Sequence, residues 1–255
     1  RIYTWNTTTS AWVQQGNDID GEAANDESGW SVALSADGLT AIVGAPSNDD
    51  NGSNSGHARI YTWDTTTSAW VQQGNDIDGE AANDESGWSV ALSADGLTAI
   101  VGAPSNDDNG SNSGHARIYT WDTTTSAWVQ QGNDIDGEAA EDLSGLSVAL
   151  SADGLTAIVG ARSNDGNGSN SGHARIYTWN TTTSAWVQQG NDIDGEAAED
   201  LSGLSVALSA DGLTAIVGAR SNDGNGSNSG HARIYTWNTT TSAWVQQGND
   251  IDGEA

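Results

Sequence analysis

The chain has 255 residues, with 35 aspartates and glutamates against 7 arginines, no lysine and a formal net charge of −28. A surface this acidic repels nucleic acid and anionic membranes, so we expect no nucleic-acid partner and no membrane insertion, and it favours an extracellular or cell-surface location. Cysteine is absent, which excludes a disulfide scaffold and a thiolate-bound metal.

The sequence is a tandem repeat with a period of 58 residues, because the string Arg-Ile-Tyr-Thr-Trp begins at positions 1, 59, 117, 175 and 233. Such self-similarity is typical of propellers, solenoids and other arrays. The fold therefore has to be derived from one unit.

Differences between the copies define two types of unit. Type A has Trp30 and Asp50, where type B has Leu146 and Gly166. Cutting the chain so that identical copies stay whole gives units 24–81 and 82–139 of type A and units 140–197 and 198–255 of type B. Residues 1–23 match 233–255 letter for letter, so we expect them to form the outer hairpin of an incomplete unit in a longer array.

In chain order, each unit after that hairpin predicts four short strands. In the first unit these are residues 31–35, 39–44, 58–63 and 69–73. Asp37-Gly38 between two apolar runs is a strong hairpin signal, and the polar segment 64–68 predicts a β-turn between the last two strands. No segment shows the 3.6-residue periodicity of a helix.

The distribution of side-chain size over these strands predicts a β-propeller. Small and branched residues fill the first two strands, while Tyr61, Trp63 and Trp70 lie on the outer two. Such a unit suits a wedge-shaped blade that is narrow at its inner strand and broad at its rim. The predicted fold class is all-β, with tandem four-stranded antiparallel propeller blades. A β-solenoid-like open array is the alternative.

Three segments of each unit resemble the FG-GAP repeat of integrin α-subunit propellers. In the first unit these are Gly-Trp-Ser-Val-Ala at 29–33, Val-Gly-Ala-Pro at 43–46 and Gly-His-Ala-Arg-Ile-Tyr at 56–61. The resemblance implies four-stranded blades, about seven to a closed ring, and an extracellular, non-enzymatic role. The integrin calcium loop lies between the first two strands, where this chain has only Ser-Ala-Asp-Gly at 35–38. The resemblance therefore implies a short-loop form without that calcium site.

Closely spaced acidic residues predict a different calcium site. The string Asp-Ile-Asp-Gly-Glu at 18–22 recurs in all five copies, and the type A loop at 48–51 adds further oxygens. Hard oxygen ligands beside a glycine suit Ca²⁺, although aspartate, asparagine and glycine also form ordinary turns. The candidate ligands are Asp18, Asp20, Glu22, Asp26, Asp76, Asp78, Glu80, Asp84, Asp134, Asp136, Asp142, Asp192, Asp194 and Asp200.

Each complete unit contains one histidine, at position 57, 115, 173 or 231. No second histidine and no Ser-His-Asp spacing accompanies it, so we interpret it as a structural hydrogen-bonding residue rather than a base or zinc ligand. Near-identical copies offer no unique asymmetric constellation of side chains, so we predict no catalytic residue and no enzyme activity.

Two kinds of surface site complete the candidates. Trp30 and Trp88 occur only in type A and could stack on sugars, with packing as the alternative interpretation. The Asn-x-Ser/Thr pattern gives candidate glycosylation sites, with turn formation as the alternative. These sites are Asn6, Asn51, Asn109, Asn167, Asn180, Asn225 and Asn238.

The predicted function is that of a non-enzymatic extracellular structural or adhesive repeat protein, a segment of an array that assembles into a fibre or cell-surface layer. The open edge of the half-unit 1–23 predicts self-association, and glycans or other surface proteins are further candidate partners. The alternative is a multivalent lectin with one glycan site per blade. A consensus-designed repeat protein is a third hypothesis, because natural copies usually diverge more.

Overall fold

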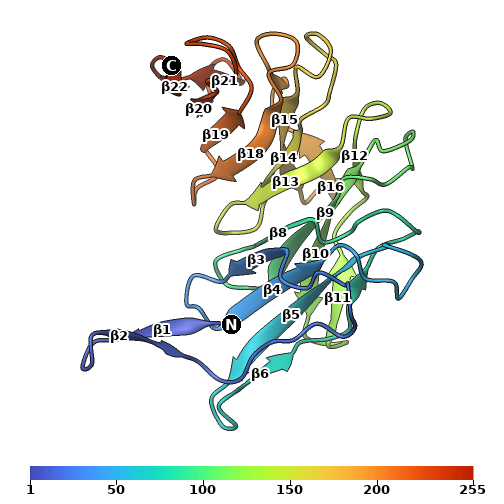
Figure 1. Ribbon diagram of the computed structural model, residues 1–255, viewed down its shortest axis with the longest axis vertical. Coiled ribbons are helices and arrows are strands. Elements are labelled where there is room, and N and C mark those ends of the chain that lie inside the picture. The colour runs from blue at the N-terminus through green and yellow to red at the C-terminus, as the bar shows by residue number, and fades with distance from the viewer. Residues whose placement is uncertain (255) are drawn as a thin grey trace.

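The computed structural model describes residues 1–254, which form a two-stranded hairpin followed by four antiparallel sheets (Figure 1). The predicted all-β class is confirmed. No helix in this part of the chain is long and apolar enough to cross a membrane.

The hairpin and the four sheets follow one another in chain order. The hairpin comprises β1 (Tyr3–Asn6) and β2 (Ala11–Gln14). Sheet 1 comprises β3 (Ser31–Leu34), β4 (Thr40–Ala45), β5 (His57–Asp64), β6 (Ala69–Gln72) and β7 (Ile77–Asp78). Sheet 2 comprises β8 (Ser89–Leu92), β9 (Thr98–Ala103), β10 (His115–Asp122), β11 (Ala127–Gln130) and β12 (Ile135–Asp136). Sheet 3 comprises β13 (Ser144–Leu150), β14 (Thr156–Ala161), β15 (His173–Asn180), β16 (Ala185–Gln188) and β17 (Ile193–Asp194). Sheet 4 comprises β18 (Ser202–Leu208), β19 (Thr214–Ala219), β20 (His231–Asn238), β21 (Ala243–Gln246) and β22 (Ile251–Asp252).

Each sheet has the strand order that the sequence predicts. In sheet 1 the order is β3-β4-β5-β6, and the tight turn between β3 and β4 is held by side chains. The Ser35 hydroxyl donates to Asp37 Oδ1 at 2.6 Å and accepts the backbone N–H of Thr40 at 2.9 Å. Gly38 has φ of +70°, a conformation that glycine adopts without strain. The sequence did not predict the short strand β7, which pairs with the start of β5.

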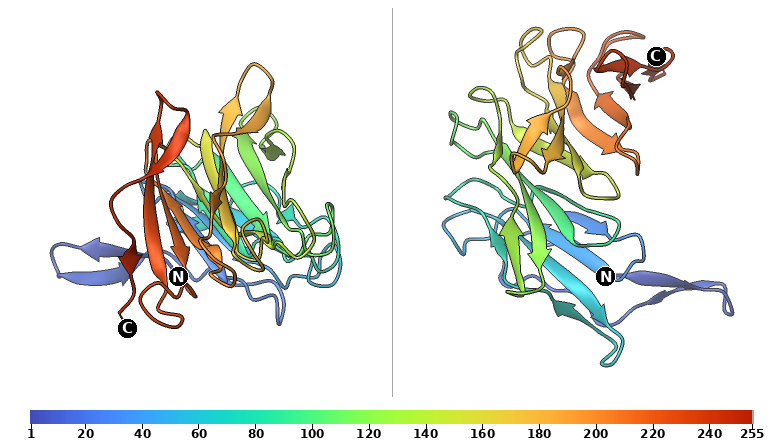
Figure 2. Two further views of the ribbon diagram at one scale, coloured as in Figure 1. Left: turned by 90° about the horizontal axis from the view of Figure 1, so that it is seen from above. Right: turned by 180° about the vertical axis from the view of Figure 1, so that it is seen from behind.

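The hydrophobic core lies between the sheets rather than within one. The first strands of successive sheets, β3, β8, β13 and β18, contact one another, so the sheets fan out around a common inner edge. Three separate clusters of buried side chains fill the three junctions. In the first of them, Ile42, Ile60 and Ile77 of sheet 1 pack against Val90 and Val101 of sheet 2. This is the arrangement of propeller blades, and Figures 1 and 2 show it as an open arc rather than a closed ring.

Neighbouring blades also approach each other through their backbones. The Ser31 hydroxyl donates to the carbonyl of Gly87 at 2.7 Å, across the junction between sheets 1 and 2. A Cβ atom added to Gly44 would lie 2.0 Å from the same carbonyl oxygen. At the rim, Trp70 Nε1 donates to the carbonyl of Gln15 at 3.0 Å. Glycines inside the junction and tryptophans at its rim therefore set the spacing of the blades.

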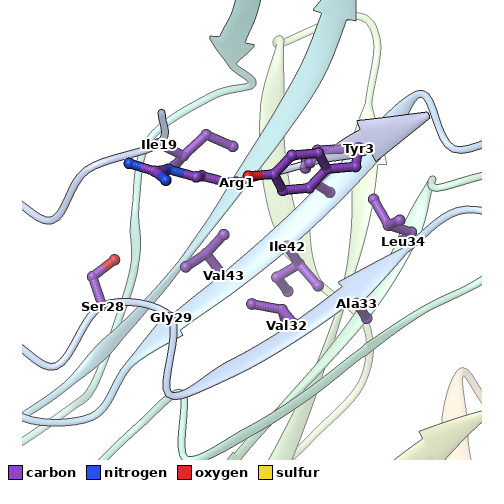
Figure 3. A pocket seen from close by; sticks show the side chains of 12 residues that line it. Arg1, Tyr3, Ile19, Ser28, Gly29, Val32, Ala33, Leu34, Ile42 and Val43 are labelled. Carbon is purple, nitrogen blue, oxygen red and sulfur yellow. The ribbon is translucent and has the colours of Figure 1, made fainter. Parts of the chain in front are cut away.

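The first sheet has one face that no full blade covers. The β1–β2 hairpin projects away from sheet 1, and β1 pairs only with β2 (Figures 1 and 2). Between the hairpin and sheet 1 lies a cavity of about 440 Å³, lined by Tyr3 and Ile19 on one side and by Val32, Leu34 and Val43 on the other (Figure 3). The expected self-association through this edge stays a prediction. The predicted unit boundaries, in the segments linking the sheets, also stay predictions.

Candidate metal centre

Each blade junction gathers a histidine and several carboxylates. At the junction of sheets 1 and 2, one nitrogen or oxygen atom from each of Glu80, Asp108, His115 and Asp134 lies within 4.8 Å of all the others. The pattern recurs in every complete unit. The other clusters are Glu22, Asp50, His57 and Asp76; Glu138, His173 and Asp192; and Glu196, His231 and Asp250.

The topology explains how these residues meet. His115 begins β10, and β12 pairs with that end of β10, which brings Asp134 beside the imidazole. Asp108 comes from the loop between β9 and β10. Glu80 lies in the segment that leaves sheet 1, so one ligand comes from the preceding unit. Each cluster therefore joins two consecutive units.

The histidines are buried with unsatisfied nitrogens. His57, His115, His173 and His231 are at most 7% exposed, and Nδ1 of each makes no hydrogen bond within the described chain. The nearest carboxylate oxygen to His115 Nδ1 is Oδ2 of Asp134, at 3.6 Å. A buried polar atom without a partner costs about 1–3 kcal/mol, so this nitrogen is suited to an additional ligand.

Burial also sets the protonation of these imidazoles. Burial, together with the charge of the neighbouring Arg117, lowers the pKa of His115 to about 4. Burial likewise lowers the pKa of His173. Both side chains are therefore neutral near pH 7, which is the form that binds a metal ion.

An arginine borders every cluster, and it occupies two different positions. Arg59 donates to both oxygens of Asp76, at 2.8 and 2.7 Å, and contacts Glu22. Arg117 instead donates to the backbone carbonyl of Asp78 at 2.8 Å and keeps only a contact with a glutamate. Because the surrounding sequences are identical, the guanidinium can leave the aspartate without disrupting the blade.

The pKa values of two neighbouring carboxyl groups shift in opposite directions. Burial alone would raise the pKa of Asp76, but the hydrogen bonds and charge of Arg59 outweigh it and hold that pKa below its ordinary value. Burial raises the pKa of Asp78, and the charges of Asp76 and Asp50 raise it further. Burial and the charge of Asp192 likewise raise the pKa of Asp194, the equivalent residue of type B. The clusters thus concentrate negative charge, and type A concentrates more of it.

The structure separates the predicted calcium ligands into two groups. Glu22, Asp76, Glu80, Asp134 and Asp192 enter the clusters with histidine. The remaining predicted ligands take other positions. Four are buried turn residues that accept hydrogen bonds from backbone N–H groups and from an asparagine, namely Asp26, Asp84, Asp142 and Asp200. Asp18 pairs with Arg1, and Asp20 is exposed. The other three lie on the short strands beside the clusters, namely Asp78, Asp136 and Asp194.

Sequence reasoning missed the histidine as a candidate ligand, and with it Asp108, Glu138, Glu196 and Asp250. One signal could have found it, because the histidine and the cluster aspartate are 19 residues apart in every unit. That interval is not a local motif, so only the pairing of the two strands gives it meaning.

The tryptophan and asparagine candidates lie elsewhere. The rings of Trp30 and Trp88 contact each other with centroids 4.7 Å apart, and Trp30 is 51% exposed. Asn6 is exposed and caps its turn by accepting the N–H of Thr8. Asn51 Nδ2, the atom that a glycan would modify, donates to the carbonyl of Gly79 at 2.7 Å. The equivalents of Asn6 are Asn180 and Asn238, and those of Asn51 are Asn109, Asn167 and Asn225.

Comparison with known proteins identifies the repeat and the fold. The FG-GAP repeat matches residues 19–61, 77–119, 134–177 and 192–235. No curated protein sequence matches the chain. Among solved structures, a periplasmic gluconolactonase of Pseudomonas aeruginosa is 13% identical with a TM-score of 0.62, and the match covers 99% of this chain and 63% of that protein. A protein described as a 6-phosphogluconolactonase from Bacteroides uniformis is 13% identical with a TM-score of 0.60, covering 99% and 64%. Hydrazine synthase of Kuenenia stuttgartiensis is 13% identical with a TM-score of 0.53, covering 95% and 53%.

The chain thus spans between about half and two thirds of the length of these proteins. The comparison contradicts the function expected from the sequence. The expectation of a non-enzymatic structural or adhesive protein, with a lectin as its alternative, is wrong because proteins sharing this fold are named as enzymes. Near-identical blades do not by themselves exclude catalysis, because function depends on the site that a fold carries rather than on the fold. At 13% identity the likeness shows the fold alone.

Proposed function

The chain belongs to the FG-GAP repeat family, and from the geometry of its blade junctions we propose that it is a divalent-cation-binding β-propeller segment. One observation carries the proposal. In every complete unit, a buried histidine with an unpartnered Nδ1 lies in a cluster with at least two carboxylates. An ion there would satisfy the nitrogen and neutralise the carboxylates together.

The ligand set favours a particular class of ion. One imidazole nitrogen with two or three carboxylate oxygens suits Zn²⁺, Mn²⁺ and related ions, whereas Ca²⁺ prefers oxygen ligands alone. Two atoms that are each about 2.1 Å from an ion lie at most about 4.2 Å apart. The cluster atoms all lie within 4.8 Å of one another, so their side chains need to close by only a small movement. We therefore propose zinc or a transition ion, with calcium as the comparison.

The junction of sheets 1 and 2 is the strongest of the four sites. Its arginine, Arg117, contacts Glu80 and the backbone of Asp78, and Asp134 is beside the imidazole without an ion pair to that arginine. Four ligand atoms come from four different segments of chain, one of them from the preceding unit. A bound ion would therefore fasten sheet 2 to sheet 1.

The test is calorimetric titration of the full chain after removal of metals with a chelator. Zn²⁺, Mn²⁺ and Ca²⁺ are added separately, at low and at high salt. We expect up to four Zn²⁺ or Mn²⁺ ions per chain, with binding that survives high salt, because salt screens diffuse attraction to an acidic surface more than direct coordination. Changing all four histidines to glutamine should abolish this binding.

Two controls separate coordination from non-specific attraction. Asp64→Asn combined with Asp122→Asn removes two charges outside the clusters, at positions where type B units have asparagine, and should leave the stoichiometry unchanged. Asp134→Asn should remove one ion without the cost of altering a buried ring. Equal binding by the histidine variant and the wild-type chain would overturn the proposal.

The same samples show whether the ion also serves chemistry. Two of the structural relatives are named as lactonases, so hydrolysis of a gluconolactone is the reaction to assay first. Metal-dependent turnover that disappears in the histidine variant would make the junction a catalytic site. Binding without turnover would leave it a cation site.

A further inference from the structure

The two types of junction differ in one ligand. Asp50 and Asp108 belong to the type A clusters, whereas Gly166 and Gly224 occupy these positions in type B. Building on the proposed function, we infer that an ion in a type B junction keeps an open coordination position, and that this position binds a small oxyanion such as a carboxylate or a phosphate. In type A the aspartate fills the same position from within the chain.

The type B junction has room for such a ligand. A Cβ atom added to Gly166 would meet only side-chain atoms, with Asn164 Oδ1 at 2.8 Å and Asp194 Oδ1 at 3.7 Å as the nearest. An open depression of about 450 Å³, lined by Gln188, Asp192 and Asp194 among others, includes the cluster aspartate, and its type A equivalent at Gln130, Asp134 and Asp136 is of about 520 Å³. Both types are therefore open on this side of the cluster, and what type B lacks there is the carboxylate of Asp50 or Asp108.

The charges of the two types favour an added anion in type B. In the first type A cluster, three carboxylates face one arginine, and a divalent ion would cancel the remaining two negative charges. In the first type B cluster, Glu138 and Asp192 face Arg175, so the same ion would leave one positive charge. Including Asp78 and Asp194, which lie on the short strands beside the clusters, gives one negative charge in type A and none in type B, so the difference of one charge remains.

The first type B junction also has arginine donors without a hydrogen bond. Arg175 Nε lies 3.3 Å from Asp192 Oδ1 but makes no hydrogen bond, whereas Arg59 of type A donates twice to its aspartate. Arg162, in the loop that carries Gly166, replaces a proline of type A, and its Nε is also buried without a partner. Arg175, which contacts the cluster carboxylates, is therefore suited to an added oxyanion. In the second type B junction Arg233 instead donates to the carbonyl of Asp194 at 2.8 Å.

The chain contains its own matched controls for this inference. The full chain is loaded with Co²⁺, whose visible absorption reports its coordination, and is titrated separately with acetate and with inorganic phosphate. Gly166→Asp with Gly224→Asp gives both type B sites the aspartate of type A, and Asp50→Gly with Asp108→Gly removes that aspartate from both type A sites. Each change copies a residue that the other type already has, so we expect the fold to persist, and circular dichroism checks it.

We expect the wild-type chain to bind two anions, the glycine-to-aspartate variant none and the aspartate-to-glycine variant four. A response to phosphate without one to acetate would assign the site to phosphate, and the reverse would assign it to carboxylates. Co²⁺ binding without an anion response, or with a response that is equal in all three chains, would overturn this inference and leave the proposed function intact. Failure to bind Co²⁺ would overturn both.

Discussion

Sheets 1 and 2 are built from type A units of the same sequence. The face of each sheet that points toward the preceding part of the chain nevertheless has different surroundings. Val32 of sheet 1 is 67% exposed, whereas its equivalent, Val90 of sheet 2, is 9% exposed. Side chains of sheet 1 cover Val90. Sheet 1 itself faces only the β1–β2 hairpin, across the cavity in Figure 3.

The strand pairing is the same in the two sheets despite this difference in exposure. Val32 pairs with Val43, and Val90 pairs with Val101, in the same register of equally long strands. A blade therefore forms from its own turns and ladders, while its burial comes from the preceding blade. Stability in such an array is approximately a sum of terms within units and terms between neighbours, and the pair of sheets allows the two to be measured separately.

The largest expected difference concerns two equivalent glycines. Gly87 has φ of +87°, and an added Cβ would lie 2.2 Å from the carbonyl oxygen of His57. Gly29 has φ of +94° and open space around it. Gly87→Ala should therefore destabilise the chain by more than about 3 kcal/mol or separate the two blades, whereas Gly29→Ala should cost only about 1 kcal/mol for its backbone conformation. Thermal unfolding of the two variants measures this, and equal losses would contradict the junction geometry.

A smaller difference should follow from alkaline titration of the equivalent tyrosines. Burial raises the pKa of Tyr119 to about 12, and partial burial raises that of Tyr61 as well. A raised pKa in the folded chain means that the neutral phenol is favoured there, so stability is complete below about pH 10 and is lost as the pH rises toward 12. The loss at Tyr119 is on the order of 2 kcal/mol. Tyr119→Phe should raise the midpoint of alkaline unfolding more than Tyr61→Phe, and tyrosinate absorbance follows the titration directly.

The two valines give a more direct measure of the covering blade. Val90→Ala removes two methyl groups from a filled junction and should destabilise the chain by about 1–2 kcal/mol. Val32→Ala removes the same atoms from an exposed position and should change stability by less than about 0.5 kcal/mol. Urea unfolding of both variants compares them. A cost at Val32 as large as that at Val90 would mean that another surface covers sheet 1 in solution.

The smallest effect is expected at a turn that differs between the unit types. Asp64 accepts the N–H of Thr66 at 2.8 Å, and Asn180 accepts the equivalent N–H of Thr182 at 2.9 Å. Asp64→Asn should therefore change the free energy of unfolding by less than about 0.5 kcal/mol, as is usual for a surface substitution, and thermal unfolding measures the change. Asp64→Ala removes the acceptor and should cost more. A large effect of Asp64→Asn would show that charge, rather than the cap, stabilises this turn.

Part of the candidate site was accessible from the sequence. The repeated Asp-Ile-Asp-Gly-Glu string marked Asp76, Glu80 and Asp134 as metal ligands, and the structure places all three in the clusters. The predicted ligands also included Asp84, which follows the string and instead caps a backbone turn and accepts a hydrogen bond from the Asn106 side chain. Spacing along the chain cannot distinguish these roles, because both require a short acidic side chain next to a tight turn.

The sequence by itself determined the repeat, the four strands of each unit and the turns between them, because these depend on alternation and on turn residues within about 20 neighbours. Only the tertiary structure decided which copy of an identical strand is buried and which histidine nitrogen meets which carboxylate. Burial of Val90 depends on side chains that come from the preceding unit, and the cluster around His115 needs Glu80 from that same unit. The physical reason is that cores and clusters here are formed between units, while the repeat specifies only the unit.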